Sequence, residues 1–255
     1  MRHRLWAKVE YDGTDFFGFQ IQACERTVQG EIERAIKAIT GVETRVTGAG
    51  RTDRGVHAKG QIVGFDVEWQ HDLSDLQRAL NATLAADVVI LAIGLAPEGF
   101  HPRFSAVSRT YRYTLLNQPR RSPLARRTAW HVTPGPDVVR MAKASRCLVG
   151  TQDFATFGQP PQAAMGRNTI RTALRAEFQE QEPFITFDIE ANAFLYQMVR
   201  SIVGTLVLVG WGSISPEEFE AMLQARDRSL VKQVAPAHGL CFMQVNYDTG
   251  KGVSQ

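Results

Sequence analysis

The sequence contains little of what builds metal centres or disulfide frameworks. Its 255 residues include three widely separated cysteines, Cys24, Cys147 and Cys241, and no CxxC pair. This pattern predicts neither a disulfide scaffold nor a zinc site, and it suits a reducing compartment. The six histidines are scattered without metal-ligand spacing, and HExxH, GxSxG and GK[ST] motifs are missing. Zinc-protease, serine-hydrolase and P-loop chemistry are therefore not expected.

Long apolar segments are also missing. The first residues, MRHRLWAKVEYDG, lack the apolar core of a signal peptide. The most apolar segment, 198–211, is interrupted by Arg200, Ser201, Gly204 and Thr205, so it is too broken to span a bilayer. We expect a cytoplasmic protein that does not use a membrane. The net charge of +3 permits an anionic partner without requiring one.

The apolar residues follow strand and helix periods in turn, which predicts an α+β fold. Strands are expected over 5–13, 61–69, 88–96 (buried), 108–117 and 239–247, with a hairpin over 168–190 that turns near Glu180–Pro183. Helices are expected over 28–39, 73–84, 138–148, 195–207 (amphipathic) and 216–224. Thr27 is the expected N-cap of the first and Gly41 its expected stop, and the last opens with an SPEE capping box.

The two halves of the chain have similar inventories of these elements. We therefore expect two related α+β lobes, 1–107 and 108–255, each with a mainly antiparallel sheet and packed helices, and an active-site cleft between them. The seam is expected within 97–120, near the stretch NQPRRSPLARR.

Residues 48–60, GAGRTDRGVHAKG, place one carboxylate, Asp53, in a glycine-rich loop with several cations. The glycines are out of register for a dinucleotide fingerprint, and a strand rather than a helix is expected to follow. Glycine lets a backbone approach a bulky polyanion closely. Arg51 and Arg54 can bind phosphate and keep Asp53 ionised, and an ionised carboxylate can act as nucleophile or base. A tight turn with a structural Asp–Arg pair is the alternative.

Six stretches in order decide between these readings: YDGTDFFGFQIQ (11–22), GAGRTDRGVHAKGQIVGF (48–65), SRTYRYTLLN (108–117), QDFATF (152–157), FLYQMVRSIVG (194–204) and PAHGLCFMQV (236–245). Together they resemble the tRNA pseudouridine synthase A (TruA-type) family over nearly the whole chain. GRTDRGVHA is the most specific element, and FLYQMVRSIVG follows it.

The resemblance implies an isomerase that converts uridine to pseudouridine at positions 38, 39 and 40 of the tRNA anticodon stem-loop. It implies no cofactor and no metal, since neither redox state nor atom count changes. The expected partners are tRNA and a second copy of the chain in a homodimer.

The resemblance also assigns roles to residues. Asp53 matches the catalytic aspartate, which attacks the ribose or removes its 2′ proton. Arg51 matches the residue that fills the stack when the uridine flips out, which a paired base requires. Tyr111 matches the tyrosine that stacks on the target base. Arg200 is the expected ionic partner of Asp53, and Leu240 the apolar wall for the base. Otherwise Arg51 would be a surface arginine, Arg200 a snorkelling one, and Tyr111 and Leu240 core residues.

Two positions depart from the family pattern: Phe19 replaces a usual tryptophan, and Cys241 replaces a common tyrosine. The basic set Arg120, Arg121, Arg126 and Arg127 can track an RNA backbone or form a solvated linker.

Two other functions compete. A non-catalytic RNA-binding module would not need a carboxylate facing an anionic ligand. A nucleoside or sugar hydrolase would usually need a second carboxylate, and the Asp53 loop holds none.

Overall fold

The computed structural model describes residues 2–159 and 168–248. Contacts divide the chain into two compact units. The first unit runs to Arg109 and takes up the chain again from Phe242, and the second unit is Thr110–Cys241. The chain passes from one unit to the other inside strands β5 (Ala106–Asn117) and β10 (Leu240–Tyr247).

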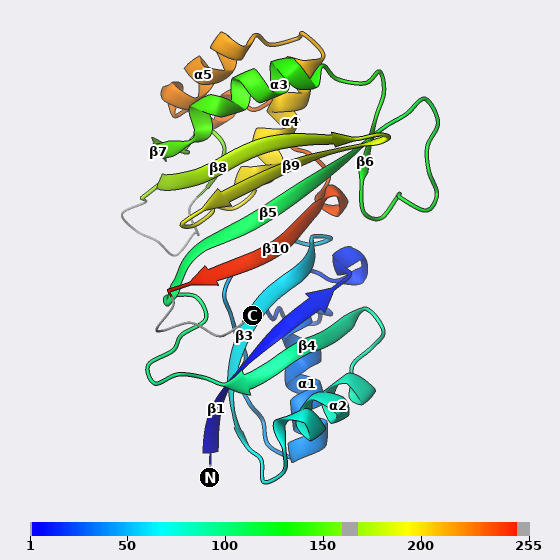
Figure 1. Ribbon diagram of the computed structural model, residues 1–255, viewed down its shortest axis with the longest axis vertical. Helices are drawn as coiled ribbons and strands as arrows, with labels where there is room; N and C mark the ends of the chain where they lie inside the picture. The colour runs from blue at the N-terminus through cyan, green and yellow to red at the C-terminus, as the bar shows by residue number, and fades with distance from the viewer. Residues whose placement is uncertain (1, 160–167, 249–255) are drawn as a thin grey trace. The chain divides into compact units, whose positions relative to one another are not determined.

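The sheet of the first unit has the strand order β4–β1–β3–β10, and β2 adds to β3. Strand β1 pairs antiparallel with both β3 and β4 (Figure 1). Alternate residues of β1 and a nearly continuous buried run in β3 face the core. The other strands of this unit are β1 Arg2–Tyr11, β2 Thr47–Gly48, β3 His57–Glu68 and β4 Val88–Leu95.

Helices α1 (Val28–Thr40) and α2 (Leu73–Thr83) pack against each other, and α2 also packs on β4 (Figure 1). Thr27 caps α1 by accepting the Gly30 N–H, and α1 ends at Gly41 in the left-handed conformation, as its sequence predicts. A short 3-10 turn, η1 Gly13–Asp15, follows β1.

The second unit has the strand order β5–β9–β8–β7, with β6 beside β5. The expected hairpin is confirmed: β8 and β9 pair antiparallel and turn at Glu182–Pro183. The β5–β6 pair is parallel, whereas the β1–β3, β1–β4, β2–β3, β7–β8 and β8–β9 pairs are antiparallel, so both units are mainly antiparallel. The strands added here are β6 Trp130–Val132, β7 Gly150–Asp153, β8 Ile170–Gln181 and β9 Phe184–Ala191.

Helices α3 (Val138–Ser145), α4 (Met198–Gly210) and α5 (Pro216–Ala225) contact one another in the second unit, and α3 also reaches β8 (Figure 1). The predicted capping box of α5 is present, with Ser215 and Glu218 bonded to each other's backbone N–H groups. Short 3-10 turns lie at Arg146–Leu148, Arg228–Leu230 and Ala237–Gly239.

Three sequence-based expectations about elements are wrong. Helix α4 begins at Met198 rather than 195, because Gln197 has a positive φ of 58° and breaks the helical path before it. It is buried on nearly every side rather than amphipathic. Strand β4 is not a buried strand: it lies at the edge of its sheet and exposes Leu91 and Leu95.

The expected α+β class with mainly antiparallel sheets is confirmed. The expected lobes, 1–107 and 108–255, stay a prediction; contacts group β10 from Phe242 onward with the first unit. Within 2–159 and 168–248, none of the helices is both long enough and apolar enough to cross a bilayer.

Candidate active site

Asp53 lies in the loop 49–56 between β2 and β3 of the first unit, which we call the Asp53 loop. Asp53 is half-buried, whereas its neighbours Arg51 and Arg54 are exposed. The predicted loop over 48–60 is too long, because β3 begins at His57 and already includes Lys59 and Gly60. The strand that was expected after the loop is therefore confirmed.

The base of the Asp53 loop is bonded to its surroundings. The Gln61 side chain bonds both backbone groups of Gly50, at 2.8 Å to its oxygen and 3.3 Å to its nitrogen. The Ala49 N–H donates to Ile62 O, and buried Arg109 donates to Ala49 O at 3.2 Å. These bonds fix where the loop leaves the sheet.

The top of the loop is held by residues 11–19, which we call the brace. The Tyr11 hydroxyl lies 2.7 Å from Thr52 Oγ1, and the Phe19 N–H donates to Thr52 O at 3.1 Å. The Gly55 N–H donates to Phe16 O at 3.3 Å. The residue directly before the aspartate and the second residue after it are thus both bonded to the brace, so the brace restricts where the carboxylate can lie.

Two glycines allow this close approach of backbones. A Cβ at Gly13 would lie 2.0 Å from Val56 O, which no side chain tolerates. Gly18 has φ +95°, a conformation that L-residues rarely adopt, and its Cβ would lie 2.7 Å from Thr52 O. Glycine in the first motif is therefore required by contact with the Asp53 loop.

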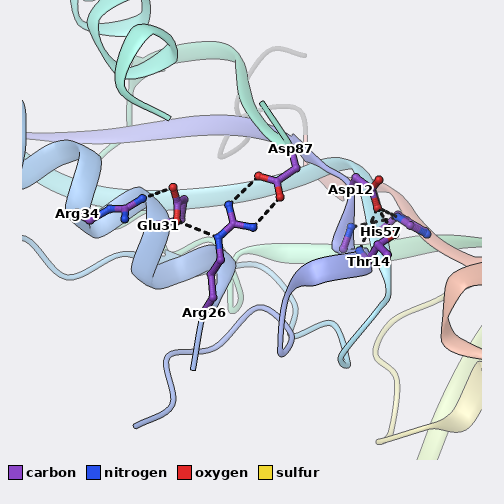
Figure 2. A network of polar contacts seen from close by, with 8 residues as sticks. Asp12, Thr14, Arg26, Glu31, Arg34, His57 and Asp87 are labelled. Atoms are coloured by element: carbon purple, nitrogen blue, oxygen red, sulfur yellow. Dashed lines mark hydrogen bonds and ion pairs between the residues drawn. The ribbon is translucent and has the colours of Figure 1, made fainter. Parts of the chain in front are cut away.

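His57 is buried and directly follows the Asp53 loop in sequence; Figure 2 shows it beside Asp12 and Thr14. Its Nδ1 lies 3.1 Å from the Gly13 nitrogen and 3.0 Å from Asp12 Oδ1. Nδ1 accepts the Gly13 N–H, while Asp12 Oδ1 accepts the Thr14 N–H and hydroxyl. His57 thereby joins β3 to the brace.

Figure 2 also shows an ion-pair network around Arg26, which joins Asp87 and Glu31 of the same unit. Arg26 makes a bidentate bond to Asp87, at 2.6 and 2.8 Å, and lies 3.4 Å from the buried Glu31. Its guanidinium also lies over the Phe16 ring, 4.1 Å from the centroid. The Asp87 bond is the main cause that raises the pKa of Arg26. The Arg26 guanidinium, held by Asp87 and Glu31, thus packs against the Phe16 ring of the brace.

The two loop arginines are directed differently. The Arg54 guanidinium stacks over the Phe17 ring of the brace, 4.0 Å from its centroid. Arg51 is exposed. Stacking on a ring leaves the edge of the Arg54 guanidinium open to phosphate oxygens, and Arg51 is exposed, so both side chains can bind a polyanion.

Tyr111 lies in the second unit, on β5, and is 7% exposed. Its ring meets Phe194 edge-on, with centroids 4.9 Å apart. Tyr113, on the same strand face, is a core residue: it is fully buried and its hydroxyl donates to Pro236 O at 2.8 Å. Burial raises the pKa of Tyr113, and the nearby Arg200 charge opposes that shift.

Arg200 and Leu240 also belong to the second unit. Arg200, on α4, donates from Nε to Ala235 O at 2.8 Å, and its own carbonyl accepts the Ala235 N–H at 3.0 Å. Leu240 begins β10 and is buried. The segment 235–240 thus joins α4 to Tyr113 on β5. Tyr111, Arg200 and Leu240 therefore lie on elements of the second unit that contact one another. Asp53 and Arg51 share one loop of the first unit.

The remaining predicted positions are placed as follows. Phe19 is buried with its ring against Gly48, so it fills an apolar site beneath the loop, and Cys241 is half-buried. The basic set is exposed on the connection between β5 and β6: Arg120, Arg121, Arg126 and Arg127. No cluster of three or more possible metal ligands occurs in the parts of the chain that the structure describes.

Sequence reasoning missed several supporting residues. Tyr11, His57 and Arg109 hold the Asp53 loop, and Phe194 contacts Tyr111. All four residues lie within the six sequence stretches that carry the family resemblance. The signal available was the presence of a polar residue at a buried strand position, as for Arg109 on β5.

Comparison with known proteins defines the class. A family model described as tRNA pseudouridine synthase matches residues 7–105 and 144–248. The chain belongs to this family of isomerases, which confirms the resemblance seen in its motifs.

The individual relatives are each described as tRNA pseudouridine synthase A. The protein from Roseiflexus sp. (strain RS-1) is 43% identical over 97% of this chain and 92% of its own length. The protein from Halalkalibacterium halodurans is 42% identical over 97% and 94%. The protein from Geobacter sp. (strain M21) is 40% identical over 94% and 96%. A solved Cbf5-Nop10-Gar1 complex matches at 12% identity and a TM-score of 0.33, covering 80% of this chain and 54% of its own; that likeness is too low to support an argument.

Proposed function

We propose that the protein converts uridine to pseudouridine in tRNA, at positions 38, 39 and 40 of the anticodon stem-loop. The observation that carries the proposal is the Asp53 loop: it lies within the region matched to the family and is held by the brace on both sides of its carboxylate. In the reaction the N1–C1′ bond breaks, C5 bonds to C1′, the C5 proton leaves to water and N1 gains a proton.

Asp53 is the proposed catalytic residue. A half-buried carboxylate on a loop fixed by backbone bonds can attack the ribose carbon or remove the 2′ proton without a large reorganisation. Both first steps need the ionised form, and both fit a loop that carries two arginines.

The other proposed residues act on the substrate around this step. Exposed Arg51 fills the space that the flipped uridine leaves. Tyr111 stacks on the uracil and lets it turn in its plane, with Phe194 holding the ring edge-on. Arg200, whose Nε is held by Ala235 O, binds the substrate by its charge, and Leu240 supplies an apolar wall for the base.

The two rival functions predict different products. A hydrolase would release free uracil, and a binding module would produce no pseudouridine at all. We propose further that the protein acts in the cytoplasm as a homodimer, with one tRNA reached by both copies.

The test is to map pseudouridine at single-nucleotide resolution, by carbodiimide labelling and primer extension, in a tRNA transcript with uridines at 38, 39 and 40. The expected result is new stops at these positions and at no uridine outside the anticodon stem-loop. Modification elsewhere in the tRNA would contradict the proposed site, and free uracil would favour the hydrolase.

A further inference from the structure

The turn 101–105 of the first unit, with the sequence HPRFS, presents an exposed aromatic ring. Phe104 is 77% exposed, and its neighbour Arg103 is exposed as well. Single exposed apolar residues are common and need no explanation by themselves. What distinguishes Phe104 is that hydrogen bonds fix the turn on both sides of it.

The turn is held from within by His101 and Ser105. His101 Nδ1 accepts the N–H groups of Arg103 and Phe104, at 3.2 and 3.3 Å. The His101 N–H donates to Ser105 Oγ at 3.0 Å, and the Ser105 N–H donates to His101 O at 2.9 Å. Burial, with the nearby charges of Arg4 and Arg103, lowers the pKa of His101, which keeps Nδ1 free to accept. The residues that flank Phe104 thus have few conformations.

The turn is also held from outside. The Tyr247 hydroxyl donates to Pro102 O at 2.8 Å, and the Pro102 ring packs on β3 at Gly64, where a Cβ would lie 2.8 Å from it. Buried Arg109 donates to Arg103 O and, with the same nitrogen, to Ala49 O. One side chain therefore ties the turn that carries Phe104 to the base of the loop that carries Asp53.

The chemistry around the exposed ring suits an RNA base. The His101 ring lies 4.4 Å from the Phe104 ring and tilted by 31°, and the Arg103 guanidinium lies 5.7 Å from its centroid. A pre-positioned aromatic ring beside a guanidinium offers a stacking surface for a base and a contact for its phosphate. A ring on a rigid turn loses little conformational entropy when a base stacks on it.

We propose that Phe104, with Arg103 beside it, is a binding site for an unpaired nucleobase and its phosphate in the tRNA substrate, outside the uridine that reacts. This inference rests on the proposed function. It assigns the exposed ring to RNA rather than to a second protein, because the ring lies beside a cation and is tied to the Asp53 loop.

The test uses binding of an unmodified tRNA transcript to the full chain. Phe104→Ala is expected to weaken binding about 5- to 100-fold, and Phe104→Trp to restore it, because stacking needs a ring rather than a particular one. The extra tryptophan fluorescence that Phe104→Trp adds to the wild-type signal should fall when tRNA binds. Leu95→Ala and Leu95→Trp are the matched controls, because Leu95 is 62% exposed on β4 of the same unit; binding within about twofold of wild type and no added quenching are expected there.

Binding by Phe104→Ala within about twofold of wild type would overturn the inference. A loss of binding in Phe104→Ala that Phe104→Trp does not restore would overturn it as well. The inference would also fail if Phe104→Ala changed the oligomeric mass in sedimentation while tRNA did not quench Phe104→Trp, because Phe104 would then contact protein. Failure of the proposed function is separate: it would appear as wild-type protein that binds tRNA yet forms no pseudouridine, with the Phe104 results unaffected.

Discussion

At the scale of single residues, the Tyr11 hydroxyl links the brace to the Asp53 loop through Thr52, and both Tyr11 and Thr52 are buried. Tyr11→Phe leaves the Thr52 hydroxyl without this bond, which costs about 1–3 kcal/mol of stability. Because the loop can then shift, we expect turnover to fall several-fold at unchanged tRNA affinity, measured by single-turnover kinetics and by filter binding.

A double-mutant cycle with Thr52→Val sharpens this prediction. The two residues share one bond, so the double variant should lose little more stability than either single variant. Thr156→Val is the control, because it removes a buried hydroxyl bond of 2.7 Å to Met222 O in the second unit. It should cost similar stability without the turnover defect. Unchanged turnover in Tyr11→Phe would mean that the brace does not position Asp53.

The cysteines allow a prediction about pH. Burial raises the pKa of Cys147 to about 11, whereas Cys24 is exposed. Only the thiolate alkylates, and a raised pKa lowers the thiolate fraction at any pH below it. At pH 8 that fraction is about a hundredfold smaller than for a thiol with an ordinary pKa of 9.0. Iodoacetamide should therefore label Cys24 long before Cys147 in peptide mass spectra, and equal rates would contradict the burial of Cys147.

At the scale of elements, the brace and the Asp53 loop depend on backbones that touch. Gly13→Ala would place a Cβ 2.0 Å from Val56 O, so the loop must move. A displacement near 1 Å at a reacting group can cost about 100-fold in rate, and we expect turnover to fall by about 10- to 100-fold.

The matched control for Gly13→Ala is Gly41→Ala. Gly41 has φ +72° but nothing within 4 Å of its Cβ position, so alanine there should cost about 1 kcal/mol of stability through backbone strain alone. Turnover should stay at the wild-type level. If both variants lose turnover equally, general destabilisation rather than loop position explains the effect.

Element types could be predicted from the sequence where a local signal was strong. Thr27 and Gly41 marked the two ends of α1, and the SPEE box marked the start of α5. The start of α4 could not be predicted, because the apolar period continues through Leu195 while the positive φ of Gln197 is set by the fold. The edge position of β4 was missed because apolar residues alone do not reveal how many neighbours a strand has.

The candidate site shows the same division. Asp53 could be named as a candidate because its motif is a continuous stretch of sequence. The links from Tyr11 to Thr52 and from Arg109 to Ala49 join residues 41 and 60 positions apart in sequence, so no local pattern contains them. Such contacts become visible only when the sheet brings its strands together.

At the scale of the whole molecule, tRNA affinity should depend strongly on salt, because phosphate contacts release counterions. We expect the double substitution Arg120→Gln, Arg121→Gln to flatten the plot of log affinity against log salt by about 1 for each phosphate that these arginines neutralise. Both residues are exposed on the β5–β6 connection.

Arg78→Gln is the control for this charge removal, because Arg78 is exposed on α2 but already pairs with Asp75. Its salt slope should match that of the wild type. If the double substitution also leaves the slope unchanged, the β5–β6 connection is a solvated linker rather than part of the RNA contact.

The central claim is that Asp53 performs the isomerisation. Tritium release from tRNA labelled at C5 of uridine tests it most directly, with the wild type and Asp53→Asn compared side by side and tRNA binding measured for both. We predict release by the wild type, none by Asp53→Asn, and similar binding by the two. Equal release by both proteins, or an equal loss of release and binding in the variant, would contradict a catalytic role for Asp53.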